Sequence, residues 1–314
     1  MSETTGRTEW KKSSRPSGVE SLLTTKDLAY ALGVSESSIK RWADEGVLRA
    51  ARTVGGHRRV PLAEAIRFVR DRRLALAHAE VLGLSDVAAL RAEPMPANDS
   101  EALRELLLAG DEGRARGLLQ SLFLSGTSVA SILDGPVREA LREIGELWHH
   151  DPAGIALEHR ATDVCAQALH RLRSFLPENP DAPMAVGGSL EGDPYFLGSL
   201  AAATLLASEG YCVANLGAST PVASLEEAAR RLSARLIWVN ISSPPEPARV
   251  PALVAGLARA VAPMGVQVTV GGSGLDADAL PRLPNLHAGR SMAELAAFVR
   301  GLASAGSAAG GVTS

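Results

Sequence analysis

The sequence predicts a multidomain protein in which two helical units precede an α/β domain. Residues 21–73 form a compact helical pattern with a tight Gly-Gly turn, and residues 99–180 are helical throughout. Across residues 181–304, short apolar runs alternate with helical patterns, which is typical of a parallel sheet with crossover helices. We therefore predict a winged helix-turn-helix, then a four-helix bundle, then a flavodoxin-like α/β domain with five parallel strands.

Three further segments are expected to lie outside these units. Residues 1–20 are polar, residues 74–98 include the stretch EPMPANDS, and residues 305–314 have low complexity. These compositions are typical of a disordered tail, a linker and a flexible tail, respectively.

Composition and charge exclude some classes of protein and favour others. No apolar run reaches 18 residues, and the polar start has no apolar core of a secretory signal, so we expect a cytoplasmic protein with no membrane contact. Cys165 and Cys212 lie far apart and need no disulfide. Residues 1–75 carry 15 Lys/Arg against 9 Asp/Glu, a balance of +6, whereas the remainder carries 17 against 26, a balance of −9. A basic end on an acidic body suggests that the basic end meets a polyanion.

The most specific pattern lies in residues 22–70. Thr24 or Thr25 can cap a first helix, Gly33 provides a turn, and Ser35 can cap a second helix. The outer side of the second helix would face a major groove of DNA, and a short hairpin wing with a Gly-Gly turn would follow it. The residues expected to contact DNA are Ser37, Ser38, Lys40, Arg41, Arg52, His57, Arg58 and Arg59.

This segment resembles the DNA-binding domain of MerR-family regulators, and the wing sequence GGHRR is what makes the pattern specific. The resemblance implies double-stranded operator DNA as a partner. A helical protein-interaction module is the alternative.

The middle helices carry three candidate ligand-binding residues. Trp148 is followed, after nine residues, by Glu158 and His159 at the start of an apolar helical stripe. Taken singly, a tryptophan is more often a core residue, and polar residues at a helix end are more often exposed. A carboxylate and an imidazole in this place can also face a ligand.

The loops after the predicted strands carry a second set of candidates. Ligands bind such sheets beyond the carboxyl ends of the strands, and glycines there let a bulky ligand approach the backbone. The candidates in these loops are Asp193, Tyr195, Gly198, Ser242, Gly271 and Gly272.

Together, these spacings resemble light-responsive, cobalamin-dependent regulators of the CarH/LitR type over almost the whole chain after residue 20. The resemblance implies a helical bundle that covers the upper face of the corrin. Trp148 and Glu158 would pack around the upper ligand, and His159 can meet cobalt once that ligand is lost. In the family, binding of adenosylcobalamin assembles a tetramer that binds operator DNA. Light breaks the cobalt–carbon bond, and the tetramer then dissociates.

Tyr195 departs from the family's motif D/E-x-H-x-x-G, which has a histidine at this position. In the family that histidine replaces the cofactor's own base beneath cobalt. A neutral phenol is a poor cobalt ligand. Several alternatives therefore stay open: cobalamin that keeps its own base, cobalamin with no lower protein ligand, a bilin or haem, or no cofactor at all.

No catalytic constellation is evident, so we predict that the chain is not an enzyme. A G-x-G-x-x-G after a strand is absent, and Asn240 stands where a phosphoreceiver domain would carry an aspartate. We predict a regulator, a homodimer or homotetramer, whose C-terminal module senses a tetrapyrrole or light and controls operator binding. The alternatives are a tetrapyrrole sensor or carrier with another cofactor and a cofactor-free regulator.

Overall fold

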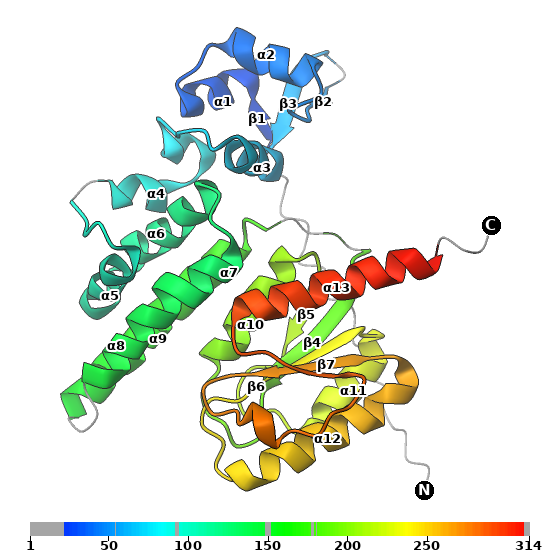
Figure 1. Cartoon of the computed structure of the whole chain (residues 1–314). Helices are drawn as coiled ribbons and strands as arrows, with labels where there is room; N and C mark the ends of the chain where they lie inside the picture. The colour runs from blue at the N-terminus through cyan, green and yellow to red at the C-terminus, as the bar shows by residue number, and fades with distance from the viewer. Residues whose placement is uncertain are drawn as a thin grey trace, which may run out of the picture.

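The computed structural model describes residues 22–310 apart from 54, 92–93, 148–151, 177–178 and 180. The predicted N-terminal tail, residues 1–20, lies outside the described residues. Figure 1 shows three units that follow one another along the chain, from the N-terminal head through a helical bundle to an α/β unit.

The head is a helix-turn-helix with a small antiparallel sheet. Its elements are β1 (Leu22–Thr24), α1 (Thr25–Leu32), α2 (Glu36–Asp44), β2 (Ala51–Arg52), β3 (Arg58–Pro61) and α3 (Leu62–Arg72). Thr24 and Asp27 form a capping box at the start of α1, and Ser35 caps α2. Gly33 ends α1 with a φ of 66°, a left-handed conformation that glycine adopts without strain. The predicted helix-turn-helix and wing are confirmed, and β1 adds a third strand in the order β1-β3-β2.

Residues 74–91, the larger part of the predicted linker, are packed structure rather than a loose connection. They contain η1 (Ala79–Leu82) and α4 (Ser85–Leu90), and Leu76, Leu82 and Val87 are buried. The backbone N–H groups of residues 77 and 78 donate to the carbonyl oxygen of Ala31, so this segment is fixed to the head. Burial of apolar side chains outweighed the polar composition that predicted a linker.

The described part of the bundle consists of helices joined by short turns, as predicted. Its elements are α5 (Asp99–Ala109), α6 (Glu112–Leu124), α7 (Val129–Ile132), the π-helical turn η2 (Leu133–Val137), α8 (Arg138–Leu147) and α9 (Pro152–Arg173). The helix α9 packs against α5, α6 and α8. Gly117 on α6 lies so close to α4 that a Cβ there would clash with the carbonyl oxygen of Asp86. Helix α4 therefore belongs to the bundle's core.

The α/β unit has the predicted parallel sheet of five strands, with the order β5-β4-β6-β7-β8. This order is the flavodoxin-like arrangement. Its strands are β4 (Met184–Ser189), β5 (Cys212–Asn215), β6 (Leu236–Asn240), β7 (Gln267–Gly271) and β8 (Leu286–Ala288). Its helices are α10 (Leu197–Ser208), α11 (Val222–Leu232), η3 (Pro247–Arg249), α12 (Val250–Val261), η4 (Ala262–Met264), η5 (Ala277–Ala279) and α13 (Met292–Gly310).

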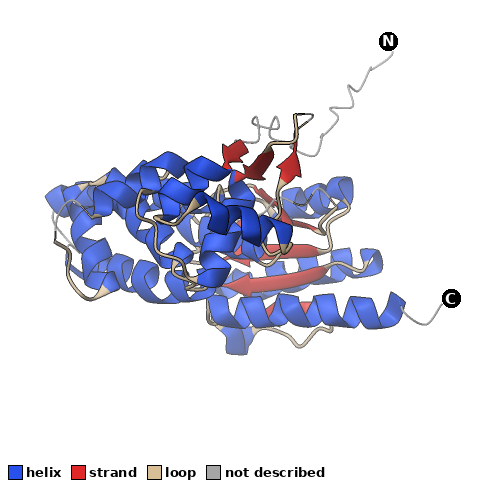
Figure 2. Ribbon diagram, turned by 90° about the horizontal axis from the view of Figure 1, so that it is seen from above, coloured by secondary structure: helices blue, strands red, loops and turns tan. Residues whose placement is uncertain are grey.

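The helices cover both faces of the sheet (Figure 2). The helices α10 and α13 share one apolar core with the bundle, while α11 and α12 pack on the other face. Helix α13 runs to Gly310 and thus takes in the first part of the expected C-terminal tail; residues 311–314 lie outside the described residues. None of the helices described is long and apolar enough to cross a membrane.

Two side chains join the three units. The Asp134 carboxylate, in the π-helical turn of the bundle, accepts hydrogen bonds from the backbone N–H groups of Met292 (2.8 Å) and Ala293 (2.9 Å) at the start of α13. The Arg70 guanidinium of α3 lies 3.8 Å from the ring centroid of Phe123 on α6. The head and the α/β unit are thus each attached to the bundle by a specific contact.

Replacing Asp134 with alanine should loosen the start of α13, because two amide groups lose their acceptor. Loss of an N-terminal cap costs about 1 kcal/mol, which corresponds to roughly fivefold faster hydrogen exchange at Met292 and Ala293. Asp111→Ala, which removes the cap of α6 instead, is the matched control and should leave these two amides unchanged. Equal exchange in Asp134→Ala and the parent protein would show that the junction does not depend on this carboxylate.

Candidate functional site

The outer side of α2 presents the polar residues predicted to face DNA. Ser37, Lys40 and Arg41 are exposed, and Ser38 is half-buried. The Ser35 hydroxyl lies 2.8 Å from the Ser37 hydroxyl and 3.0 Å from that of Ser38. Because Ser35 is the cap of α2, the hydroxyl cluster marks the N-terminal end of the helix, which is the end that a recognition helix presents to base edges.

The wing is braced against α2 by a carboxylate that the sequence did not single out. Arg58 on β3 is paired with Asp44 at the end of α2, and only 21% of its side chain is exposed. Arg52 lies 3.8 Å from the same carboxylate but keeps 65% of its side chain exposed. His57 at the turn is exposed, and Arg59 is half-buried. The structure therefore separates the wing cations into a half-buried brace, Arg58, and more exposed groups, Arg52 and His57.

Two of the bundle candidates, Glu158 and His159, belong to α9, which extends beyond the α/β unit together with α8 (Figure 1). Trp148 lies outside the described residues. Glu158 is half-buried and His159 is exposed, both in the first half of α9. Ile155 is 50% exposed, and the first buried apolar side chain of α9 is that of Ala161. This end of α9 thus presents an apolar side chain, a carboxylate and an imidazole outside the packed core.

Asp193 ties two loops together at the carboxyl-terminal edge of the sheet. Its side chain is fully buried, and its carboxylate accepts hydrogen bonds from the backbone N–H groups of Tyr195 (3.1 Å), Ser242 (2.5 Å) and Ser243 (3.0 Å). The loop after β4 and the loop after β6 are therefore held by a single carboxylate. Two of the predicted site residues, Asp193 and Ser242, are in direct contact.

Two buried polar residues complete this edge: Ser189, which the sequence did not single out, and Asn240, which the sequence places at the end of a predicted strand. The Ser189 hydroxyl at the end of β4 donates to the carbonyl oxygen of Tyr195 (2.5 Å). The Asn240 amide at the end of β6 donates to the hydroxyls of Ser242 (2.9 Å) and Ser189 (3.3 Å). Their position as the last residues of neighbouring strands is the signal by which they could have been found.

The glycines predicted to line the site instead allow segments of this protein to pack closely against one another. A Cβ at Gly198 would clash with the Asn240 side chain, and one at Gly272 would clash with the backbone of Ile241. At Gly271, a Cβ would lie 3.0 Å from the carbonyl oxygen of Gly289. The space that each glycine leaves is thus taken up by the protein itself, whereas the sequence suggested that a ligand would use it.

Just outside this packed edge, two aromatic side chains are exposed to solvent. Tyr195 is 51% exposed and Phe196 is 37% exposed. Large aromatic side chains are among the most effective contact surfaces for flat ligands. Within the described residues, no group of three or more His, Cys, Asp or Glu side chains is arranged to hold a metal ion.

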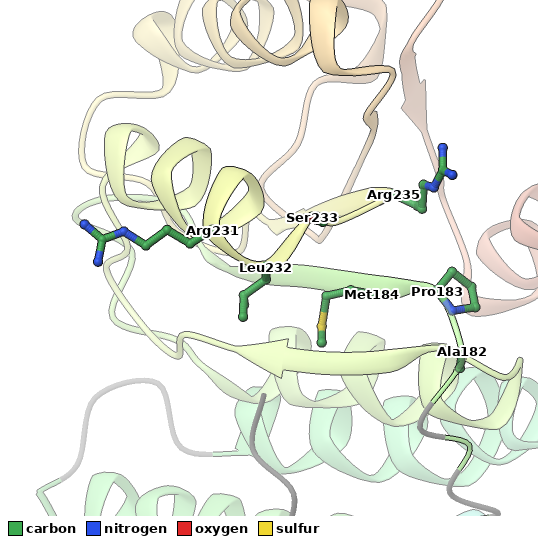
Figure 3. A pocket seen from close by; sticks show the side chains of 7 residues that line it. All are labelled: Ala182, Pro183, Met184, Arg231, Leu232, Ser233 and Arg235. Carbon is green, nitrogen blue, oxygen red and sulfur yellow. The ribbon is translucent and has the colours of Figure 1, made fainter. Parts of the chain in front are cut away.

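A separate hollow of about 330 Å³ lies at the opposite end of the sheet (Figure 3). It is lined by Ala182, Pro183, Met184, Arg231, Leu232, Ser233 and Arg235. Arg231 is already paired with Glu227 at 2.6 Å. None of the predicted site residues lies in this hollow.

Comparison with known proteins assigns the first two units. Residues 22–73 match the helix-turn-helix domain family, and residues 100–173 match the B12 binding domain family. The chain is 28% identical to the HTH-type transcriptional repressor CarA of Myxococcus xanthus over 262 residues, which cover 80% of this chain and 87% of that protein.

Two corrinoid proteins are also similar to parts of the chain. Dimethylamine corrinoid protein 1 of Methanosarcina acetivorans is 23% identical over 114 residues, which cover 35% of this chain and 54% of that protein. The solved structure of the monomethylamine corrinoid protein of Methanosarcina barkeri is 17% identical and covers 63% of this chain and 94% of its own, with a TM-score of 0.49. The chain carries a helix-turn-helix domain followed by a B12-binding domain and is homologous, over most of its length, to the transcriptional repressor CarA.

Proposed function

We propose that this protein is a DNA-binding transcriptional regulator whose cobalamin-binding module controls its hold on operator DNA. One observation carries the proposal: matches to a helix-turn-helix domain and to a B12 binding domain occur in one chain that is 28% identical to the repressor CarA over 80% of its length. The contacts Arg70–Phe123 and Asp134–α13 support it, because they give a ligand-binding unit a physical connection to the head. We place this activity in the cytoplasm and assign the chain no enzymatic role.

The head supplies a cationic surface for double-stranded DNA. The side chains of Arg41 and Arg52 are 66% and 65% exposed, on α2 and in the wing respectively. Cations in such positions reach phosphates, whereas Ser37 and Ser38 at the start of α2 are placed to meet base edges. Lys40 is paired with Glu36 at 3.0 Å, so we assign it a smaller share of the binding.

The described residues suit the apolar face of a corrin but do not suit a lower imidazole from the α/β unit. Tyr195 and Phe196 supply exposed aromatic surface at the sheet edge, and Ile155 and Glu158 extend from α9. Position 195 holds a phenol where the family's motif has an imidazole. His159, exposed on α9, is our candidate cobalt ligand from the bundle.

For the step that couples cofactor binding to DNA binding, we propose the mechanism of the family that the sequence resembles. Bound adenosylcobalamin would supply a cobalt–carbon bond that light can break. The chain's own part is to hold the corrin between the sheet edge and α9, and to present an assembly surface only while α9 is held in that position. We propose that the assembled form is a dimer or tetramer, which presents two or more heads to one operator.

Arg52→Ala should weaken binding to all DNA sequences similarly and lower the slope of log K against log salt by about one unit. Arg58→Ala should in addition lower the head's melting temperature, because the brace to Asp44 is lost. Arg259→Ala, at an exposed position on α12, makes the same change in net charge and should leave DNA binding unchanged. Fluorescence anisotropy at several salt concentrations measures the slope, and an unchanged slope in Arg52→Ala would remove the wing from the interface.

Phe196→Ala and Tyr195→Ala should each weaken cobalamin binding by about threefold to tenfold, which is the loss expected for one aromatic contact. Met264→Ala is the matched control, because Met264 is also 37% exposed but lies on η4, after α12. An absorbance titration with hydroxocobalamin measures the affinities. Equal losses in all three variants would place the cofactor elsewhere.

Adenosylcobalamin should increase the molar mass of the full chain in the dark, and illumination should reverse the increase. Size-exclusion chromatography with light scattering measures both states. A monomer under every ligand and light condition would leave control through assembly without a basis.

A further inference from the structure

We propose that the α/β unit binds a corrinoid that keeps its own nucleotide base on cobalt, and that the interior of the sheet does not admit that base. The proposal rests on the proposed function, since it requires a corrinoid at the carboxyl-terminal edge. It specifies the form of the ligand, a corrinoid whose own nucleotide base coordinates cobalt, and it specifies the protein surface on which that base lies. Four observations carry it.

The first observation is the absence of an imidazole where a lower ligand would be needed. The sequence has one histidine between residues 181 and 304, His287. This residue lies on β8, which β6 and β7 separate from β4, so that three strand spacings, about 14 Å, intervene. Its ring is stacked on Phe298, with the ring centroids 4.1 Å apart. The His287 ring is therefore packed against Phe298 at the far edge of the sheet. It cannot displace a nucleotide base from a cobalt ion bound near β4.

The second observation is that the space between β4, β6 and α10 is filled. The Trp238 ring occupies the place that a side chain at Gly187 would take, and Trp238 is only 2% exposed. Its indole N–H donates to the Ser199 hydroxyl (3.0 Å), which donates in turn to the Asn215 side chain (2.8 Å). A displaced base could enter only by breaking this buried hydrogen-bonded chain, and each unsatisfied buried group would cost about 1–3 kcal/mol.

The third observation concerns the mouth of the same space. The Asn240 side chain occupies the place that a Cβ at Gly198 would take, and it bonds to Ser189 and Ser242. Asp193 then fixes the two loops above it through Ser242 and Ser243. The Asp193 carboxylate thus already accepts three backbone N–H groups, so most of its acceptor positions are taken by the loops. A carboxylate beside a metal-bound histidine instead accepts from the imidazole.

The fourth observation is the surface that remains. Tyr195 and Phe196 are adjacent, are 51% and 37% exposed, and lie just outside the closed mouth. Two exposed aromatic rings offer a contact surface for a flat heteroaromatic base. A base that stays folded beneath its own corrin can therefore rest on these rings without entering the sheet.

The nuclear spin of the axial nitrogen provides a direct test on the full chain. Protein labelled uniformly with ¹⁵N is loaded with unlabelled cob(II)alamin, and electron paramagnetic resonance reports the nitrogen bound to cobalt. A ¹⁴N ligand from the cofactor splits the signal into triplets, whereas a ¹⁵N imidazole from the protein splits it into doublets. We expect triplets with cobalamin. With cobinamide, which lacks the nucleotide base, we expect no nitrogen splitting in labelled His159→Ala, the variant that removes the bundle's candidate cobalt ligand.

A second variant tests the closed interior separately from the missing histidine. Labelled Tyr195→His should still give triplets, because the base has no space to move into even when an imidazole is offered. Doublets in the parent protein or in Tyr195→His, or bound cobalamin without nitrogen splitting, would overturn this proposal while leaving the proposed function intact. If neither corrinoid is retained by the parent protein through gel filtration, the cobalamin-dependent function falls together with it.

Discussion

The buried carboxylate of Asp193 is the interaction on which the carboxyl-terminal edge of the sheet depends. It accepts three backbone N–H groups from two loops that are about fifty residues apart in sequence. A buried charge is costly unless it is hydrogen-bonded, and here the bonding partners are the loops themselves. The loops must close on Asp193, and their closure requires glycine at positions 198 and 272, where a Cβ would clash with Asn240 and Ile241. The exposure of Tyr195 follows, because its backbone N–H and carbonyl groups are both held from the inside.

Sequence reasoning was most reliable where local chemistry decides the structure. The caps Thr24 and Ser35, the turn at Gly33 and the five parallel strands could be predicted, because caps, turns and periodicity act over a few residues. The packing of residues 74–98 could not be predicted, because their polar composition says nothing about the apolar groove that receives Leu82 and Val87. Position in sequence likewise does not show that Arg58 is half-buried against Asp44, whereas Arg52, at 3.8 Å from the same carboxylate, stays 65% exposed.

The candidate site shows the same division between local and tertiary information. The spacing of Asp193, Ser242 and the Gly271-Gly272 pair correctly identified one edge of the sheet, because the ends of parallel strands meet there. What fills the interior behind that edge depends on Trp238 and Asn240, whose side chains could have packed elsewhere. A motif of small residues therefore indicates that another group lies close to the backbone, but it does not show whether that group is a ligand or part of the protein. At Gly187 and Gly198, the partner is another side chain of the same unit.

The contacts between units limit how a ligand at the sheet edge can influence the head. The α/β unit is attached to the bundle through Asp134 and through the core that α10 and α13 share with it. The head is attached to the bundle through α6 and the packed residues 74–91. The bundle therefore lies on every path that these contacts provide between the sheet edge and the DNA-binding surface. The proposed ligand would touch the bundle at the start of α9, where Ile155 and His159 are exposed, and α9 packs against α6, which carries Phe123 beneath Arg70. A shift of α9 would thus move the surface on which the head rests, whereas a change confined to the loops around Asp193 would be absorbed by the closed, hydrogen-bonded edge.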